Sequence, residues 1–246
     1  MTALPNLPRV PLKRMDPSML VFELHREADR LLTRADGELI TSAATMASFL
    51  HRNQTRFVRG DLARVPYIEH PLRVALRLIR WGVTDPELIA AALLHDVVED
   101  CADELLQIFG EAEDQNDPVR CLQRLYRSQI ARYVETVTNP KQGTYEEHID
   151  TIAWLASPAL LIKASDLKDN AGSIKHQLGH GKDEKMLRLL RKYLPVIPMV
   201  AEGLVDTPQV AHPKFDYATP AATARHELHQ LHTDLLELAD AHGVSH

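Results

Sequence analysis

Several residue types are scarce in this sequence, and each shortage argues against a class of protein. Only two of the 246 residues are cysteine, and neither Cys101 nor Cys121 lies in a CxxC pair or at zinc-finger spacing from a histidine. This argues against a disulfide scaffold or a zinc finger and favours two buried thiols in a reducing compartment. The 34 acidic residues outnumber the 28 lysines and arginines, and the resulting net charge of −6 is unusual for a nucleic-acid-binding protein.

Long apolar runs are also missing. No run reaches the about 18 apolar residues that a membrane-spanning helix needs. The beginning of the chain contains several prolines but no apolar core of a signal peptide, so residues 1–15 are expected to form an extended arm. We therefore expect a cytoplasmic protein that binds neither membranes nor nucleic acid, and the sequence leaves a homo-oligomer open.

Helical periodicity is the dominant pattern that is present. Asp16-Pro17 and Asp85-Pro86 each place a capping aspartate before a proline at the first helical position. No segment alternates like a β-strand, so we predict an all-α bundle of about nine or ten helices, with room for one small β-hairpin. The predicted helices cover residues 17–32, 38–54, 71–82, 86–100, 102–109, 118–137, 144–156, 158–171, 183–203 and 221–241.

The length allows one large domain with an extension. Apolar residues make up 45% and charged residues 25% of the 246 residues, which is the balance of an ordinary globular protein with a sizeable core. After the arm, we expect residues 16–205 to form this domain. Residues 206–246, a proline-containing loop followed by an amphipathic helix, are expected to pack on the same domain.

Chemically active residues gather at the carboxyl end of the most apolar predicted helix. The sequence there continues His95-Asp96-Val97-Val98-Glu99-Asp100. On one continuous helix the four polar residues lie at about 0, 100, 40 and 140° around the axis, so they share one arc. Three carboxylates and an imidazole on a buried arc require a compensating charge, which a divalent cation supplies. A solvated acidic helix end with a satisfied histidine is the alternative interpretation.

Two further segments favour the metal. His70 precedes a proline at the start of one predicted helix, and Asp166 lies near the polar end of another apolar helix. Taken singly, His70 is typical of a capping histidine, and Asp166 of a partner for Lys163. Together with His95 and Asp96 they form a mixed nitrogen and oxygen set. Such a set suits Mn²⁺, Fe²⁺ or Zn²⁺, with positions left for water and substrate.

These residues carry a family resemblance. His70, the His95-Asp96 doublet and Asp166 resemble the H…HD…D signature of the HD-domain metal phosphohydrolases. Over roughly residues 40–175 the chain further resembles the hydrolase domain of the RelA/SpoT family, through PYIEHP at 66–71, AALLHDVVED at 91–100, FG at 109–110 and VT at 137–138. The resemblance implies an HD-type helical bundle. It also implies the activity of the small stand-alone alarmone hydrolases of the stringent response, which remove the 3′-pyrophosphate of (p)ppGpp to leave GDP or GTP.

The resemblance implies roles for individual residues. The implied ligands of one divalent metal ion, most often Mn²⁺ in that family, are His70, His95, Asp96 and Asp166. Glu99 and Asp100 match the acidic pair that activates water and handles protons. The implied substrate-binding residues, which include an arginine that packs on the guanine and an asparagine near the ribose and base, are Arg56, Asn170, Lys163, Lys168 and Tyr67.

Two departures from the family pattern bear on the substrate. About five extra residues follow Arg56, which leaves three rivals for the contact with the base: Arg52, Arg59 and Arg64. The family's basic residue after the metal-binding aspartate is Leu167 here, so either Lys163 or Lys168 takes its place or the phosphate contact is lost. Two alternative functions therefore stay open. One is an HD-type phosphatase for another nucleotide, such as NADPH, a dNTP or an adenosine alarmone, and the other is a retired module that binds nucleotides without turnover.

Two other histidine groups are assigned no site. His226, His229 and His232 lie three residues apart on the last predicted helix and spread over about 120° of its surface, which is typical of a solvated face. His176 and His180 lie in a basic segment with two glycines. A flexible loop is the simpler interpretation of that segment, and a loop that closes over phosphates is the sharper one.

Overall fold

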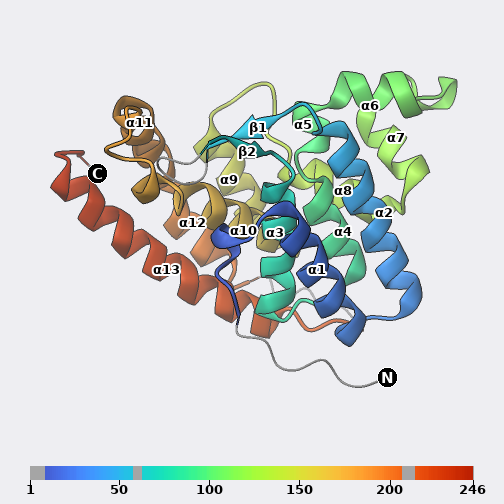
Figure 1. Ribbon diagram of the computed structural model, residues 1–246, viewed down its shortest axis with the longest axis horizontal. Helices are drawn as coiled ribbons and strands as arrows, with labels where there is room; N and C mark the ends of the chain where they lie inside the picture. The colour runs from blue at the N-terminus through green and yellow to red at the C-terminus, as the bar shows by residue number, and fades with distance from the viewer. Residues whose placement is uncertain (1–8, 58–62, 207–213, 246) are drawn as a thin grey trace.

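Two buried helices occupy the centre of the computed structural model, which describes residues 9–57, 63–206 and 214–245 (Figure 1). They are α3 (Glu69–Trp81) and α4 (Pro86–Leu94), and nearly every residue of both is buried. The helices that pack around this pair are α1 (Pro17–Leu31), α2 (Arg34–Leu50), α8 (Ser128–Val137) and α10 (Ala159–Ala171). The all-α prediction is confirmed, and the polar ends of α3, α4 and α10 meet inside the bundle.

Helix starts follow the predicted capping chemistry. Asp16 accepts a hydrogen bond of 2.8 Å from the amide of Met19, and Asp85 accepts one of 2.9 Å from the amide of Glu87. Each bond satisfies an amide that has no partner within its own helix. Gly82 ends α3 with a φ of 102°, a left-handed conformation that glycine adopts without steric cost.

Three of the predicted helices are each divided in two, so the described residues contain more helices than expected. Residues 86–100 form α4 and the short α5 (Val97–Asp100), residues 118–137 form α7 (Pro118–Leu125) and α8, and residues 183–203 form α11 (Asp183–Tyr193) and α12 (Val196–Gly203). The last division follows from Pro195, which has no amide hydrogen to continue α11. The first places His95 and Asp96 in a turn instead of on a continuous helix arc, which corrects the geometry expected from the sequence.

The small β-hairpin that the prediction left room for is present, and it lies beside the start of α3. Strands β1 (Thr55–Arg56) and β2 (Val65–Pro66) pair antiparallel, with Arg56 opposite Val65. This pairing places Arg56 next to the segment that leads into α3. Arg59, one of the rival arginines, lies outside the described residues.

The remaining helices cover the core from the outside. They include α6 (Ala102–Phe109), α9 (Tyr145–Trp154) and α13 (Ala218–Ala241), with short 3-10 turns at Leu12–Arg14, Ala112–Asp114 and Ile174–His176. Helix α13 runs along one side of the bundle and packs on α10, α12 and α3 (Figure 1). Among the described residues, no helix is both long and apolar enough to cross a membrane. The division into an arm, a domain and a C-terminal extension stays a prediction.

Candidate metal centre

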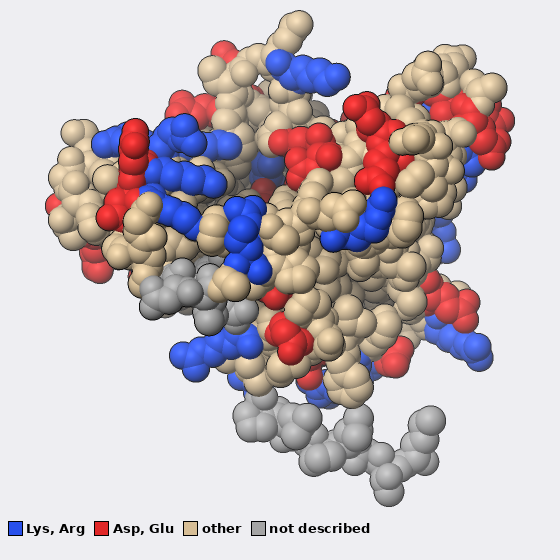
Figure 2. All heavy atoms as spheres, turned by 45° about the horizontal axis from the view of Figure 1, so that its top comes forward, with Lys and Arg blue, Asp and Glu red and all other residues tan. Residues whose placement is uncertain are grey.

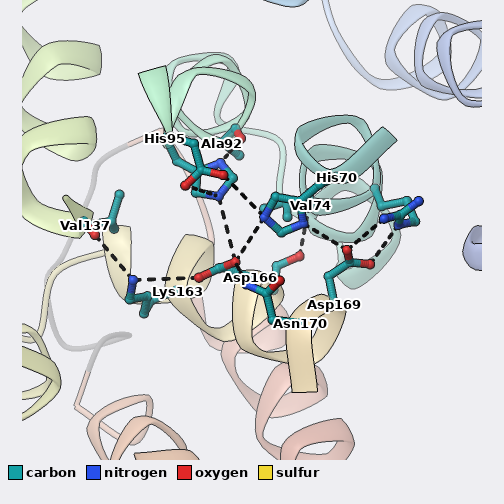
Figure 3. A network of polar contacts seen from close by, with 12 residues as sticks. His70, Val74, Ala92, His95, Val137, Lys163, Asp166, Asp169 and Asn170 are labelled. Atoms are coloured by element: carbon teal, nitrogen blue, oxygen red, sulfur yellow. Dashed lines mark hydrogen bonds and ion pairs between the residues drawn. The ribbon is translucent and has the colours of Figure 1, made fainter. Parts of the chain in front are cut away.

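The predicted ligands converge where α3, α4 and α10 meet, and Figure 3 shows three of them, His70, His95 and Asp166. His70 is the second residue of α3, His95 and Asp96 follow α4, and Asp166 lies in α10. One ligand atom from each of His70, His95 and Asp166 lies within 4.8 Å of the others. Asp96 joins them, because its Oδ1 lies 3.2 Å from His95 Nε2 and its Oδ2 lies 3.5 Å from His70 Nε2. We call these four residues the histidine–aspartate cluster.

Within the cluster, the carboxylates and the imidazoles shift one another's pKa values in opposite directions. Burial would lower the pKa of His95, but the carboxylates of Asp96 and Asp166 outweigh it and raise that pKa to about 9. Burial would raise the pKa of Asp166, but the neighbouring imidazoles of His70 and His95 and the ammonium of Lys163 keep it well below its ordinary value. The carboxylates therefore stay ionised at neutral pH and attract cations.

The Nε2 atoms of both imidazoles face the carboxylates. His95 Nδ1 lies 2.9 Å from the carbonyl oxygen of Ala92, which can only accept, so Nδ1 carries a hydrogen and Nε2 is the nitrogen through which His95 can bind a metal ion. Nε2 of His95 is buried, and within the described parts of the chain it has no hydrogen-bond partner. A buried nitrogen of this kind, facing two carboxylates and a second imidazole, fits a divalent cation.

A buried carboxylate behind His70 completes the support of the cluster. Asp169 is fully buried, and its Oδ2 accepts a hydrogen bond of 2.8 Å from His70 Nδ1. Arg73 donates to both oxygens of Asp169 at 2.8 and 3.0 Å, Arg77 donates at 3.3 Å, and Lys13 donates to its backbone oxygen at 2.7 Å. Burial opposes ionisation of Asp169, but the charge of Arg73 and the bond from His70 hold its pKa well below the usual range. Asp169 thus fixes the tautomer of His70, with Nε2 directed at the cluster.

Asp169 and its arginine partners are not among the site residues predicted from the sequence. A usable signal was present, since Asp169 follows Asp166 by three residues and therefore lies near it on the same helix. Arg73 and Arg77, four residues apart among apolar residues of α3, were the matching signal on that helix. Only the packing of α3 on α10 shows that these two signals belong together.

The predicted acidic pair lies at the exposed edge of the cluster. Glu99 and Asp100 are both exposed and lie on α5, directly after the turn that carries Asp96. The side-chain amide of Asn139 donates to the Glu99 carboxylate at 2.8 and 3.0 Å, and this holds the carboxylate in one orientation. Partial burial, followed by the charge of Asp96, raises the pKa of Asp100. One carboxylate is therefore oriented, and the other ionises less readily than an ordinary aspartate.

Three of the predicted substrate-binding residues are bonded to the cluster or to each other. The Tyr67 hydroxyl donates to Asp96 Oδ2 at 2.7 Å. Asn170 Nδ2 donates to Asp166 Oδ1 at 2.5 Å, and Arg56 donates to Asn170 Oδ1. The guanidinium of Arg56 also lies 5.4 Å from the centre of the Tyr67 ring. The β-hairpin thus places Arg56 against Asn170 and Tyr67, which are both bonded to the histidine–aspartate cluster.

The two predicted lysines point in different directions. Lys163 is buried, and its ammonium lies 3.7 Å from Asp166 Oδ2. Lys168 instead donates to the backbone oxygen of Glu227 on α13 and pairs with its carboxylate, both at 3.2 Å. Leu167, between them, is fully buried in the core. The structure therefore brings Lys163 to the cluster and holds Lys168 against α13.

Other candidate groups lie apart from the cluster. Arg52 pairs with Glu104 at 2.5 Å, whereas Arg64 lies at a cavity beside Arg56. His226 and His229 are exposed on α13. Within the described ranges, His70, His95 and Asp166 form the one group of three or more histidine, cysteine or acidic residues whose geometry suits a metal. Cys101 and Cys121 are both free and buried.

Known proteins similar to this chain span most of its length. It is 32% identical over 177 residues to zebrafish (Danio rerio) guanosine-3′,5′-bis(diphosphate) 3′-pyrophosphohydrolase MESH1, which covers 69% of this chain and 86% of that protein. It is 30% identical over 178 residues to mouse (Mus musculus) MESH1, which covers 69% and 87%. A solved structure of a metazoan orthologue of SpoT that hydrolyses ppGpp has a similar fold, with a TM-score of 0.51, 21% identity, and coverage of 80% and 94%. No protein-family model matches the chain.

Proposed function

This chain belongs to the family of MESH1-type guanosine-3′,5′-bis(diphosphate) 3′-pyrophosphohydrolases, and from that premise we propose that it removes the 3′-pyrophosphate of (p)ppGpp to give GDP or GTP and pyrophosphate. The observation that carries the proposal is the histidine–aspartate cluster itself. It directs an unpartnered nitrogen of His95 at two ionised carboxylates, and it lies directly beside the exposed acids Glu99 and Asp100.

The metal ion in this proposal is held by His70, His95, Asp96 and Asp166. We assign Mn²⁺, because two imidazoles and two carboxylates form a borderline set of ligands, and the family resemblance favours that ion. When bound, a divalent ion acts as a Lewis acid on a phosphoryl oxygen and lowers the pKa of water from about 15.7 toward neutrality. The proposal keeps the predicted cytoplasmic location, which suits two free cysteine thiols.

The acidic pair moves the protons. Glu99, oriented by Asn139, accepts a proton from the water that attacks the phosphorus bonded to the 3′ oxygen. The bond between that phosphorus and the 3′ oxygen breaks, and Asp100 gives a proton to the oxygen so that a 3′ hydroxyl forms. Pyrophosphate is the other product. The raised pKa of Asp100 is consistent with its acting as the acid.

The remaining predicted residues bind the nucleotide. The planar guanidinium of Arg56 packs on the guanine, and Asn170, which is bonded to both Arg56 and Asp166, contacts the ribose. Tyr67 lies between Arg56 and the metal ligands. We propose that Lys163 supplies the positive charge that the family places next to the aspartate. Substrate binding by Lys168 stays a prediction, and its bonds to α13 give the proposal no contact for it.

A panel of nucleotides incubated with the Mn²⁺-loaded protein and analysed by chromatography tests this function. We expect pyrophosphate to be released from ppGpp and pppGpp. Asp96→Ala is expected to lower the rate by at least about 10³-fold, because it removes a metal ligand. Asp234→Asn, which removes an exposed carboxylate paired with Lys175 on the far helix α13, is the matched control and should retain the rate.

The same panel separates the alternatives. Turnover of NADPH, a dNTP or an adenosine alarmone without turnover of ppGpp would indicate an HD-type phosphatase with another substrate. Binding of nucleotides without turnover of any of them would indicate a retired module. Wild-type activity of Asp96→Ala would contradict the assignment of the site.

A further inference from the structure

A cavity lies directly beside the histidine–aspartate cluster. Its volume is about 190 Å³, and its lining includes Arg56 and Asn170, the latter also bonded to the cluster through Asp166. The cavity is smaller than the roughly 300–1,000 Å³ of a site that encloses a whole drug-sized ligand. It can therefore enclose only part of a nucleotide, and the rest must lie along its rim.

Two further cations, Arg64 and Lys185, line this cavity and have no role in the proposed reaction. The guanidinium of Arg64 lies 4.5 Å from the centre of the Phe57 ring, and the ammonium of Lys182 packs on the same ring. Partial burial and then the charges of Arg64 and Lys185 lower the pKa of Lys182. The three positive groups therefore lie close enough to repel one another. We call Arg64, Lys182 and Lys185 the cationic rim.

No described carboxylate neutralises the cationic rim. Over residues 9–57, 63–206 and 214–245, none of its three members forms an ion pair within 4.0 Å. The nearest acids along the chain, Asp183 and Glu184, begin α11, and Asp183 accepts a hydrogen bond from the amide of Gly179. Figure 2 shows lysine and arginine side chains gathered on the left of the molecule, where α11 lies, although the whole chain carries a net charge of −6.

Two hydrogen bonds to Thr55 orient the guanidinium of Arg64 and leave other N–H donors for an anion. Its Nε donates to Thr55 Oγ1 at 2.6 Å, and its Nη2 donates to the Thr55 backbone oxygen at 2.5 Å. These bonds use two of the five N–H donors, and the stacking on Phe57 fixes the plane of the group. The remaining donors form part of the fork that binds phosphate oxygens in pairs. Lys185, near the start of α11, adds a mobile point charge.

From this arrangement we infer that the cationic rim binds the 5′-phosphates of the nucleotide. The inference rests on the proposed function, which places the 3′-pyrophosphate at the cluster. A ribose carries its 3′ and 5′ substituents on opposite sides, so with Asn170 at the ribose the 5′ group points away from the cluster. The cavity beyond Asn170 is lined in part by Ile174, Met186 and Leu189, which suit the flat face of a base. The rim then lies within reach of the 5′ group.

Titration calorimetry of the Mn²⁺-loaded full chain with guanosine, GMP and GDP tests the inference. None of these compounds has a 3′-phosphate, so none is a substrate. We expect GDP to bind more tightly than GMP, and GMP more tightly than guanosine. The double variant Arg64→Ala/Lys185→Ala should weaken GDP binding by about 10- to 100-fold through the loss of charge-assisted hydrogen bonds, and leave guanosine binding unchanged.

Arg191→Ala is the matched control, because Arg191 is an exposed cation of the same helix that does not line the cavity. A melting curve for each variant confirms that it is folded. The inference is overturned if GDP and guanosine bind the wild type equally, or if the double variant binds GDP as Arg191→Ala does.

Kinetics separate this inference from the proposed function. With pGpp, ppGpp and pppGpp as substrates, the double variant should raise KM for all three, least for pGpp, which has a single 5′-phosphate. It should leave kcat unchanged, since it removes binding that is equal in the ground and transition states. Failure of the wild type to release pyrophosphate from any of the three would overturn the proposed function, while the GDP titration still tests the rim. If the double variant turns over all three substrates with the KM values of the wild type, the inference about the cationic rim is overturned and the proposed function stands.

Discussion

The buried and the open side of the histidine–aspartate cluster both concentrate positive charge, yet they differ in what neutralises it. On the buried side, Arg73, Arg77 and Lys13 all donate to Asp169, whose carboxylate is fully enclosed and bonded to His70. On the open side, the cationic rim surrounds Phe57 without a described carboxylate partner.

The difference indicates what each side does. Buried charges are costly unless they are fully paired, so the cations of the buried side need an anion of their own. Asp169 is that anion, and it also orients His70, the proposed metal ligand. Exposed cations cost little free energy when they are unpaired. The cations of the open side can therefore stay unpaired until they bind an anionic group of the substrate. Substitutions on the buried side should therefore change stability and metal binding, and those on the open side should change only turnover or substrate binding.

Asp169→Asn should have the largest effect of all. Both carboxylate oxygens accept from the guanidinium of Arg73, so an amide nitrogen at either place meets another donor. We expect the free energy of unfolding to fall by about 3–5 kcal/mol, as for other broken buried ion pairs. The affinity for Mn²⁺ should fall about 10- to 100-fold.

Urea denaturation and Mn²⁺ titration measure these two effects. Asp234→Asn is the control, since its carboxylate forms an exposed pair with Lys175 and should contribute less than about 1 kcal/mol. Unchanged Mn²⁺ affinity in Asp169→Asn would show that the buried side does not support the metal.

Glu99→Gln should affect turnover without affecting stability. The amide oxygen of glutamine can still accept a bond from Asn139, but the side chain can no longer take a proton. We expect kcat to fall about 10²- to 10⁴-fold, with the melting temperature and the Mn²⁺ affinity unchanged. Steady-state kinetics with ppGpp measure the first quantity. A melting temperature that falls together with kcat would place Glu99 among the structural residues.

Lys13→Met tests the outer edge of the buried side through pH. Burial lowers the pKa of Lys13 to about 7, against 10.5 in the unfolded chain. Between these values the unfolded chain binds one more proton than the folded one, so the contribution of Lys13 makes stability rise with pH. We expect Lys13→Met to reduce the gain in stability from pH 7 to pH 9 by about 1–2 kcal/mol.

Denaturation curves at the two pH values measure this gain. Lys175→Met, which removes an exposed ammonium paired with Asp234, should leave the gain as it is in the wild type. If Lys13→Met and the wild type gain the same stability, the ammonium of Lys13 is not buried as described.

The smallest effect is expected for Lys168→Met. Its ammonium is bonded to Glu227 on α13, so its removal should cost less than about 1 kcal/mol of stability and change KM for ppGpp less than about twofold. Lys163→Met, beside Asp166, should lower kcat/KM about tenfold through the loss of a charge near the phosphates. If both substitutions changed kcat/KM equally, Lys163 would be no more important for turnover than Lys168.

The features of the fold and the site that depend on local sequence pattern could be predicted. Capping aspartates marked the starts of α1 and α4, and the spacing of apolar residues located most of the helices. Residue types and the family's H…HD…D signature predicted His70, His95, Asp96 and Asp166 as ligands, and the structure brings these four residues together from three segments.

The parts that depend on packing could not be predicted. A continuous helix over 86–100 was expected, but the chain turns at His95 and Asp96, and Tyr67 donates to Asp96 from 29 residues away. Arg73 and Arg77 have the spacing of a solvated helix face, and their burial becomes evident only when α10 places Asp169 against them. Periodicity records which residues share a face but not what that face meets.

Titration of the metal-free protein with Mn²⁺, with pyrophosphate release from ppGpp followed at each step, tests the central claim most directly. The account predicts no release without metal and a rise in rate that saturates at one Mn²⁺ per chain. It further predicts that Asp166→Ala neither binds the ion tightly nor turns over. Full pyrophosphate release by the metal-free protein, or by Asp166→Ala, would contradict the claim that this cluster holds the catalytic ion.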